Sequence, residues 1–363
     1  GGIIVSVGGP LDIAAKVNAL QAVVKLPLLV GADLETGAAF RARGGWFLPN
    51  AIELGGATSF PYQMGIGASR DTALAYEMGR VTAIEGRAMG IHMAFAPVLD
   101  VNNNPKNPVI AARSFGEDPE LVSRMGAALV RGIQEHGMLA TGKHFPGHGA
   151  VVADSHHDLP IDRRALIDMD QDLAPYRLLI ANGLPAVMVA HVLYPDIDSV
   201  PASASTRWIR GLLRTEMRFQ GVVFADDLSM AGAASVGGIV ERAERALAAG
   251  CDVLLEKPMA LTIPDCQAIV RTARRHGRRL AVGHELRLSS QWGEIRRIID
   301  RGVIGDPQYV LVELSRKPYR LGASGWRYDP ARVGSWVLEE PIHFFDLARW
   351  YLEGAGRPVE LHA

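Results

Sequence analysis

The chain has 363 residues with 38 basic and 39 acidic side chains, so its formal charge is −1. This near-neutral charge argues against a nucleic acid or an anionic membrane as partner, because both bind basic surfaces. The two cysteines cannot form a disulfide framework, no apolar run approaches the roughly 20 residues of a membrane span, and no signal peptide is visible. We therefore expect a globular, cytoplasmic protein without a membrane partner.

Short, continuous apolar runs alternate with helical patterns as far as residue 256. Such runs are typical of parallel strands that are buried on both faces. The predicted strands are Ile3–Ser6, Pro27–Asp33, His92–Val98, Leu139–His144, Ala186–His191, Val222–Asp226 and Asp252–Glu256. The predicted helices are 71–89, 119–136, 164–182, 206–219 and 239–249. The Gly-rich stretch 34–70 has no helical period and is predicted to be a loop. This alternation indicates an α/β fold with a parallel sheet.

Polar side chains lie at the ends of five of these seven strands. They are Asp33, Asp100, the Lys143-His144 pair, His191 and the Asp226-Asp227 pair. In a (β/α)8 TIM-type barrel the active site is built at the carboxyl ends of the strands. Polar residues at this many strand ends therefore predict one convergent pocket.

The pattern changes after residue 256. Basic residues gather at 271–279 and 296–301, which are most simply solvated helix faces. We expect helices at 264–276, 290–301 and 342–352, strands at 280–286 and 308–314, and a loop around Gly325–Arg327. These elements predict a C-terminal α+β segment.

The densest polar cluster runs from Lys143 to Gly149 and continues at Asp154–His157, with four of the eleven histidines inside fourteen residues. Asp154 stands two positions before His156, so its carboxylate can orient and stabilise that imidazole. A plain surface loop is the alternative. A helical zinc motif is excluded, because Pro146 and Gly147 interrupt the chain between the two nearest histidines. No metal is therefore expected.

Asp226 is a second candidate. A carboxylate at the end of a buried strand is costly unless it is paired or functional. As a nucleophile it would attack an anomeric carbon and form a glycosyl-enzyme. The alternative is an N-cap for the following helix, a role that Asp227 could fill instead.

These motifs carry a family resemblance. Residues 1–255 resemble the catalytic barrel of glycoside hydrolase family 3, nearest its bacterial β-N-acetylhexosaminidase branch. The matching runs are Phe95–Asn102, Arg113–Gly116, Lys143–Gly149, Asp154–His156, Ala190–His191 and Asp226–Met230. The family barrel begins one strand and one helix earlier, so we expect this barrel to be truncated at its N-terminus.

The resemblance implies a role for each matching residue. Asp226 resembles the catalytic nucleophile, and His156 with Asp154 resembles the acid/base dyad of the hexosaminidase branch. The residues implied to bind sugar hydroxyls are Asp33, Arg113, Lys143 and His144, with His191 lining the same pocket. The implied reaction is retaining hydrolysis of a terminal N-acetylglucosaminide in two displacements, with a carbohydrate as partner and no cofactor.

Residues 256–363 resemble the Gfo/Idh/MocA oxidoreductases. The matching runs are Glu256–Pro258, Val282–His284, Gly325–Arg327 and Glu339–Asp346. In that family a Lys and a His lie near the nicotinamide and the substrate, and Lys257 and His343 match them. A solvated lysine and a core histidine are the plain alternatives. The nearest Gly-rich phrase, Gly65–Ser69, lacks a preceding strand, so a dinucleotide has no phosphate cradle.

The chain thus resembles two incomplete families joined near residue 255. A right-handed crossover would place 280–286 beside 252–256, in the gap left by the lost first strand. The strand would then pair with Ile3–Ser6 and close the ring. A glycosidase is the first functional expectation. An NAD(P)-dependent sugar oxidoreductase fragment and an inactive chimeric scaffold are the alternatives.

Overall fold

The computed structural model describes residues 2–23, 27–47, 52–288, 290–313 and 328–356. Its strands are β1 Gly2–Ile4, β2 Leu29–Ala32, β3 Gly45–Phe47, β4 Ile52–Leu54, β5 Met93–Ala94, β6 Leu139–Phe145, β7 Ala186–Val189, β8 Val222–Ala225, β9 Val253–Glu256 and β10 Leu280–Gly283. Its α-helices are α1 Pro10–Val23, α2 Gln63–Ala68, α3 Thr72–Ala88, α4 Pro119–Glu135, α5 Asp170–Ala181, α6 Ile239–Ala249, α7 Ile263–Arg275, α8 Ser290–Asp300, α9 Pro330–Val333, α10 Trp336–Glu339 and α11 Pro341–Tyr351. Among these helices none is long and apolar enough to cross a membrane.

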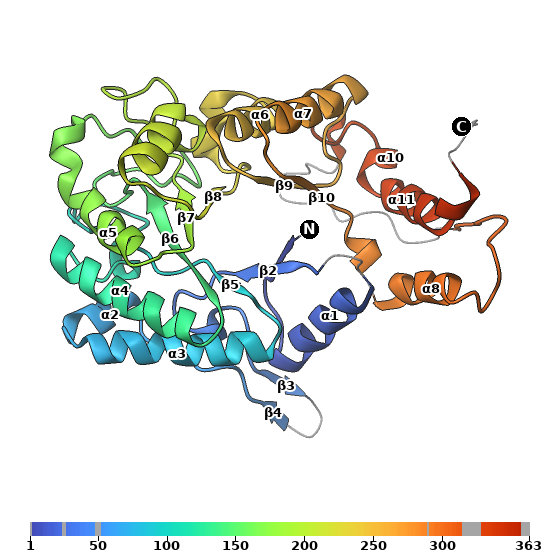
Figure 1. Ribbon diagram of the computed structural model, residues 1–363, viewed down its shortest axis with the longest axis horizontal. Helices are drawn as coiled ribbons and strands as arrows, with labels where there is room; N and C mark the ends of the chain where they lie inside the picture. Colours follow the sequence, from blue (N-terminus) through green and yellow to red (C-terminus); the bar gives the residue numbers. More distant parts are fainter. Residues whose placement is uncertain (1, 24–26, 48–51, 289, 314–327, 357–363) are drawn as a thin grey trace.

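The main sheet is parallel, with strand order β1-β2-β5-β6-β7-β8. A single parallel bridge from Phe224 to Asp252 continues it toward β9, and β10 pairs with β9. The sheet curls and helices cover its outer side (Figure 1). The chain is therefore an α/β protein with a curled, parallel half-barrel, which brings the carboxyl ends of its strands toward one region.

The outer helices pack closely on one another. Asp118 caps α4 by accepting a hydrogen bond from the backbone of Glu120, which fixes where the helix begins. A Cβ on Gly79 of α3 would lie 2.3 Å from the carbonyl oxygen of Leu129 on α4. Glycine at this crossing therefore lets the two helices approach more closely than any side chain would allow.

The predicted strands of the first 256 residues are confirmed, and most of them are shorter than expected. The prediction of a loop over 34–70 is wrong. That stretch holds the antiparallel β3–β4 hairpin and α2. Strands of three residues and a helix of six are too short to give a readable period. The helix expected over 206–219 is confirmed in place, as a π-helix over Arg207–Glu216.

The C-terminal part departs further from expectation. Residues 308–313 form no strand, so that prediction is wrong for them, while residue 314 and the 325–327 loop lie outside the described residues. β10 pairs with β9 as expected, and Leu280 lies opposite Val253. Within the described residues β1 pairs with β2 and shares no ladder with β10, so the expected ring closure is not formed by pairing.

The last segment instead reaches the first helix. The turn η7 (Glu285–Leu288) and α8 both contact α1, at the side of the sheet where β1 lies (Figure 1). The C-terminal segment is thus packed on the N-terminal end of the barrel.

Candidate active site

The first group of site residues joins the ends of β2 and β6. The Lys143 ammonium lies 2.9 Å from Asp33 Oδ1 and 2.7 Å from Glu35 Oε1. Arg41 donates to the other oxygen of Asp33 at 2.5 Å. Burial alone would lower the pKa of Lys143, but the two carboxylates outweigh it and raise that pKa. Lys143, which is 2% exposed, therefore stays cationic.

Arg113 completes this group. Its guanidinium binds Glu35 through two hydrogen bonds, Nε to Oε2 at 2.9 Å and Nη2 to Oε1 at 2.8 Å. Burial would raise the pKa of Glu35, yet Lys143 and Arg113 hold it far below its ordinary value. Sequence reasoning missed Glu35. Its position two residues after Asp33, on the same face of an extended segment, was the available signal.

A buried carboxylate, Asp100, organises the end of β6. It is 0% exposed and accepts from His144 Nδ1 at 2.7 Å and from the backbone N–H of His148 at 2.7 Å. Burial would raise its pKa, but the two histidines and the backbone N–H lower it, so the carboxylate is ionised. With Nδ1 directed at Asp100, the Nε2 of His144 faces Arg113 Nη2 at 3.4 Å. The sequence places Asp100 among the polar strand ends, and the structure makes it the group that orients His144.

Asp226 follows β8 directly and is half-buried. Burial would raise its pKa, but His144, His191, the backbone N–H of Asp227 and Lys143 together hold the pKa below its ordinary value. The Asp227 N–H donates to Asp226 Oδ1 at 2.9 Å. An ionised carboxylate thus lies within the field of the cationic group described above.

His191 is fully buried after β7. Its Nδ1 lies 2.7 Å from Ser203 Oγ and its Nε2 lies 3.0 Å from the carbonyl oxygen of Asp227. Burial lowers its pKa despite the nearby carboxylates, so the ring is neutral at neutral pH. Both ring nitrogens are engaged by protein groups, which fixes the ring beside Asp226.

The Asp154–His156 pair lies on a turn after β6. His156 Nδ1 is 2.6 Å from Asp154 Oδ1, and the same oxygen accepts from the His156 backbone N–H at 2.9 Å. Burial would raise the pKa of Asp154, and its bonds to His156 lower it, with a net downward effect. The His156 side chain is 54% exposed, in contrast to the groups above. The expected carboxylate–imidazole pair is therefore formed.

The oxidoreductase candidates lie elsewhere. Lys257 is half-buried just after β9, and His343 is 4% exposed within α11. The phrase Gly65–Ser69 falls on α2 and its C-cap rather than on a strand-to-helix turn. A Cβ on Gly67 would lie 1.9 Å from the carbonyl oxygen of Phe115, so this glycine serves helix packing.

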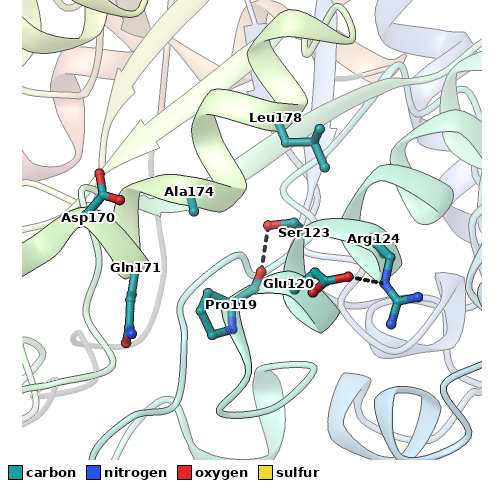
Figure 2. Close-up of a pocket in the computed structure, with 8 residues that line it drawn as sticks. All are labelled: Pro119, Glu120, Ser123, Arg124, Asp170, Gln171, Ala174 and Leu178. Carbon is teal, nitrogen blue, oxygen red and sulfur yellow. Dashed lines mark hydrogen bonds and ion pairs between the residues drawn. The ribbon is translucent and has the colours of Figure 1, made fainter.

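Two further findings concern metal ligands and a surface pocket. Among the described residues, no group of three or more His, Cys, Asp or Glu side chains is arranged to hold a metal ion. A surface pocket between α4 and α5 contains none of the predicted site residues (Figure 2). It is lined by Pro119, Glu120, Ser123, Arg124, Asp170, Gln171, Ala174 and Leu178. This pocket belongs to the outer helical layer.

Comparison with known proteins identifies two families. The glycosyl hydrolase family 3 N-terminal domain matches residues 10–275, and the GFO/IDH/MocA C-terminal domain matches residues 292–363. A β-hexosaminidase of Thiobacillus denitrificans is 46% identical over 248 residues, covering 68% of this chain and 67% of the relative. One from Thioalkalivibrio sulfidiphilus is 39% identical over 305 residues, covering 81% and 85%.

Solved structures agree. A family 3 β-N-acetylglucosaminidase from Paenibacillus superposes with a TM-score of 0.67 at 33% identity, covering all of this chain and 59% of that one. NagZ from Neisseria gonorrhoeae in complex with N-trifluoroacetyl-D-glucosamine gives 0.61 at 36% identity, covering 76% and 78%. This chain thus spans less than two thirds of the Paenibacillus protein. On the extent of the family match and the identity of these relatives, the chain belongs to glycosyl hydrolase family 3.

Proposed function

We propose that this chain is a retaining exo-β-N-acetylhexosaminidase acting on terminal N-acetylglucosaminides. The observation that carries the proposal is the half-buried Asp226 carboxylate directly after β8, whose pKa is held below its ordinary value by His144, His191, the Asp227 N–H and Lys143. The relatives named β-hexosaminidase and the NagZ complex with an N-acylglucosamine analogue support this substrate class.

In the first step Asp226 attacks the anomeric carbon and the bond to the leaving oxygen breaks. The lowered pKa of Asp226 keeps the carboxylate nucleophilic at neutral pH. The Asp227 N–H holds one of its oxygens, which favours attack by the other. The product of this step is a glycosyl-enzyme ester.

His156 acts as general acid in the first step and as general base in the second. Its Nδ1 is engaged by Asp154, so Nε2 is the nitrogen that delivers the proton to the leaving oxygen. In the second step the same nitrogen takes a proton from water, whose oxygen attacks the anomeric carbon. The bond to Asp226 breaks, the carboxylate is regenerated and the sugar is released with overall retention. The exposure of His156 suits a group that must meet both aglycone and water.

The cation-rich group at the ends of β2 and β6 binds the sugar. Asp33, Arg113, Lys143 and His144 offer donors and acceptors matched to ring hydroxyls, and His191 supports the pocket wall. Glu35 and Asp100 hold these groups in place through the bonds described above. Preorganised binding of this kind contributes to the rate because little rearrangement is needed at the reacting carbon.

The test is hydrolysis of p-nitrophenyl N-acetyl-β-glucosaminide, with the product anomer followed by NMR. We expect the β-anomer to appear first and Asp226→Asn to abolish turnover. An α-anomer as first product, or unchanged turnover in the variant, would refute the proposal.

We also propose a cytoplasmic location, in keeping with the free thiols of Cys251 and Cys266.

A second candidate, an NAD(P)-dependent sugar oxidoreductase, rests on the GFO/IDH/MocA match to residues 292–363. That match is to a C-terminal domain, and the nearest Gly-rich phrase is part of α2. A shift in melting temperature with nicotinamide dinucleotide would favour this candidate. An inactive scaffold would show neither that shift nor hydrolysis.

A further inference from the structure

Ser155 is buried between the two residues of the proposed acid/base pair. It is 3% exposed, whereas the side chains of Asp154 and His156 are 27% and 54% exposed. A serine hydroxyl buried between two accessible polar neighbours needs a partner inside the protein. That partner is His148, whose Nε2 lies 2.9 Å from Ser155 Oγ.

His148 is itself tied to the sugar-binding group. Its backbone N–H donates to Asp100 Oδ1, and Asp100 Oδ2 accepts from His144 Nδ1, both at 2.7 Å. The His148 ring is 3% exposed and meets the His144 ring edge-on, with centroids 6.1 Å apart. Burial lowers the pKa of His148, so its ring is neutral. The bond from His148 to Ser155 therefore connects the turn that carries Asp154 and His156, here called the dyad turn, to the buried hydrogen bonds around Asp100.

The opposite side of the same turn is bound to the segment that follows Asp226. The backbone N–H of Gly232 donates to the carbonyl oxygen of Ser155 at 2.9 Å. A Cβ on Gly232 would lie 2.8 Å from the carbonyl oxygen of His191 and 3.2 Å from Ser155 Cβ. Glycine at this position lets the β8 segment, the β7 end and the dyad turn meet.

We propose that His148 and Ser155 are positioning residues that set where His156 presents its proton relative to Asp226. The inference rests on the proposed function. Ser155 receives one bond from the side of the sugar-binding group and one from the side of the nucleophile. Its place therefore couples the exposed pair to both. Both residues are only 3% exposed, so they act through His156 rather than on the substrate.

The test compares two leaving groups. A phenyl N-acetyl-β-glucosaminide needs protonation of its leaving oxygen, whereas the 2,4-dinitrophenyl analogue leaves without it. We expect Ser155→Ala to lower kcat/KM about tenfold on the phenyl substrate and less than twofold on the dinitrophenyl substrate, as for loss of one positioning hydrogen bond. His148→Phe should behave alike, and His148→Gln, which keeps a hydrogen-bonding group, should restore most of the loss.

Ser123→Ala is the matched control. Ser123 is also buried and donates to the carbonyl oxygen of Pro119 in α4, away from the dyad. It should leave the ratio between the two substrates unchanged. An equal fall on both substrates in Ser155→Ala would mean general damage and would overturn the inference, as would no fall at all.

A readout without turnover separates this inference from the proposed function. The amides of His156, His157 and Asp158 are bonded within the turn to Asp154. In Ser155→Ala these amides should exchange with solvent several-fold faster, while amides of β6 keep their rates. Unchanged exchange rates would refute the inference that Ser155 positions this turn, whatever the activity of the variant. Absence of hydrolysis by the wild-type chain would instead refute the proposed function.

Discussion

The charged groups at the ends of β2 and β6 differ from the Asp154–His156 pair in how they are held. Glu35 and Lys143 are nearly buried and share partners, so that each charge is compensated at two or more positions. The dyad is exposed and depends on the turn around Ser155. The difference is what the proposed function requires, because a sugar must be bound in a fixed pose whereas a proton must be exchanged with solvent.

The largest effect is expected from Asp226→Asn. The amide cannot form the glycosyl ester, so kcat/KM should fall by about 10⁴-fold. Substrate affinity should stay near that of the wild type, because the cationic group is untouched. Calorimetric titration with N-acetylglucosamine measures this, and a loss of binding together with activity would contradict the separate roles.

His156→Ala should affect activity and leave stability alone. Loss of the general acid should cost about 10²- to 10⁴-fold on a phenyl glycoside. The free energy of unfolding should change by less than about 0.5 kcal/mol, because the side chain is exposed. Urea unfolding and aryl glycoside kinetics together check this. A large destabilisation would show that the dyad turn is part of the core framework.

Glu35→Gln, unlike His156→Ala, should lower the stability of the fold. Removing one charge of a buried pair leaves Arg113 and Lys143 undercompensated, and we expect a loss of about 3 kcal/mol in unfolding free energy. Arg279→Gln is the matched control, because Arg279 binds Asp252 through Nε at 2.9 Å and Nη2 at 2.5 Å but is 78% exposed. That pair should contribute less than about 1 kcal/mol. Equal losses of unfolding free energy in the two variants would contradict the claim that the buried charges are held differently from exposed ones.

The smallest effect concerns pH. The pKa values of Asp33 and Glu35 are lower in the folded chain than their ordinary values, so their stabilisation is present above about pH 4.5 and is lost as pH falls through the folded values. Between pH 5 and pH 3.5 the wild type should lose about 1 kcal/mol more than Glu35→Gln. Urea midpoints at the two pH values measure this. Parallel pH profiles would mean that Glu35 is not the group responsible.

Much of the barrel could be predicted because its strands are continuous apolar runs with polar residues at or near their carboxyl ends. Asp33, Lys143 and His144 lie together as expected because parallel strands end at one edge. Arg113, which only the family resemblance implied, joins them from the short helix η2 (Ala111–Arg113). The short hairpin and α2 within 34–70 could not be read, because they span too few residues to show a period.

The partners of the two supporting carboxylates were harder to foresee. Glu35 and Asp100 act through contacts with residues 78 and 44 positions away, as in the Arg113–Glu35 and His144–Asp100 bonds. No local pattern encodes such partners. The pairing of β10 with β9 followed from the handedness of the crossover, whereas the contact of α8 with α1 depends on how the whole segment folds back.

That last contact has a consequence for how the chain is made. Residues of α1 are synthesised before the η7 and α8 residues that contact them, which come more than 260 positions later. A chain folding during synthesis must keep one flank of α1 uncovered until the residues of η7 and α8 have been made. Pausing translation before residue 285 should therefore prolong the exposure of that flank of α1.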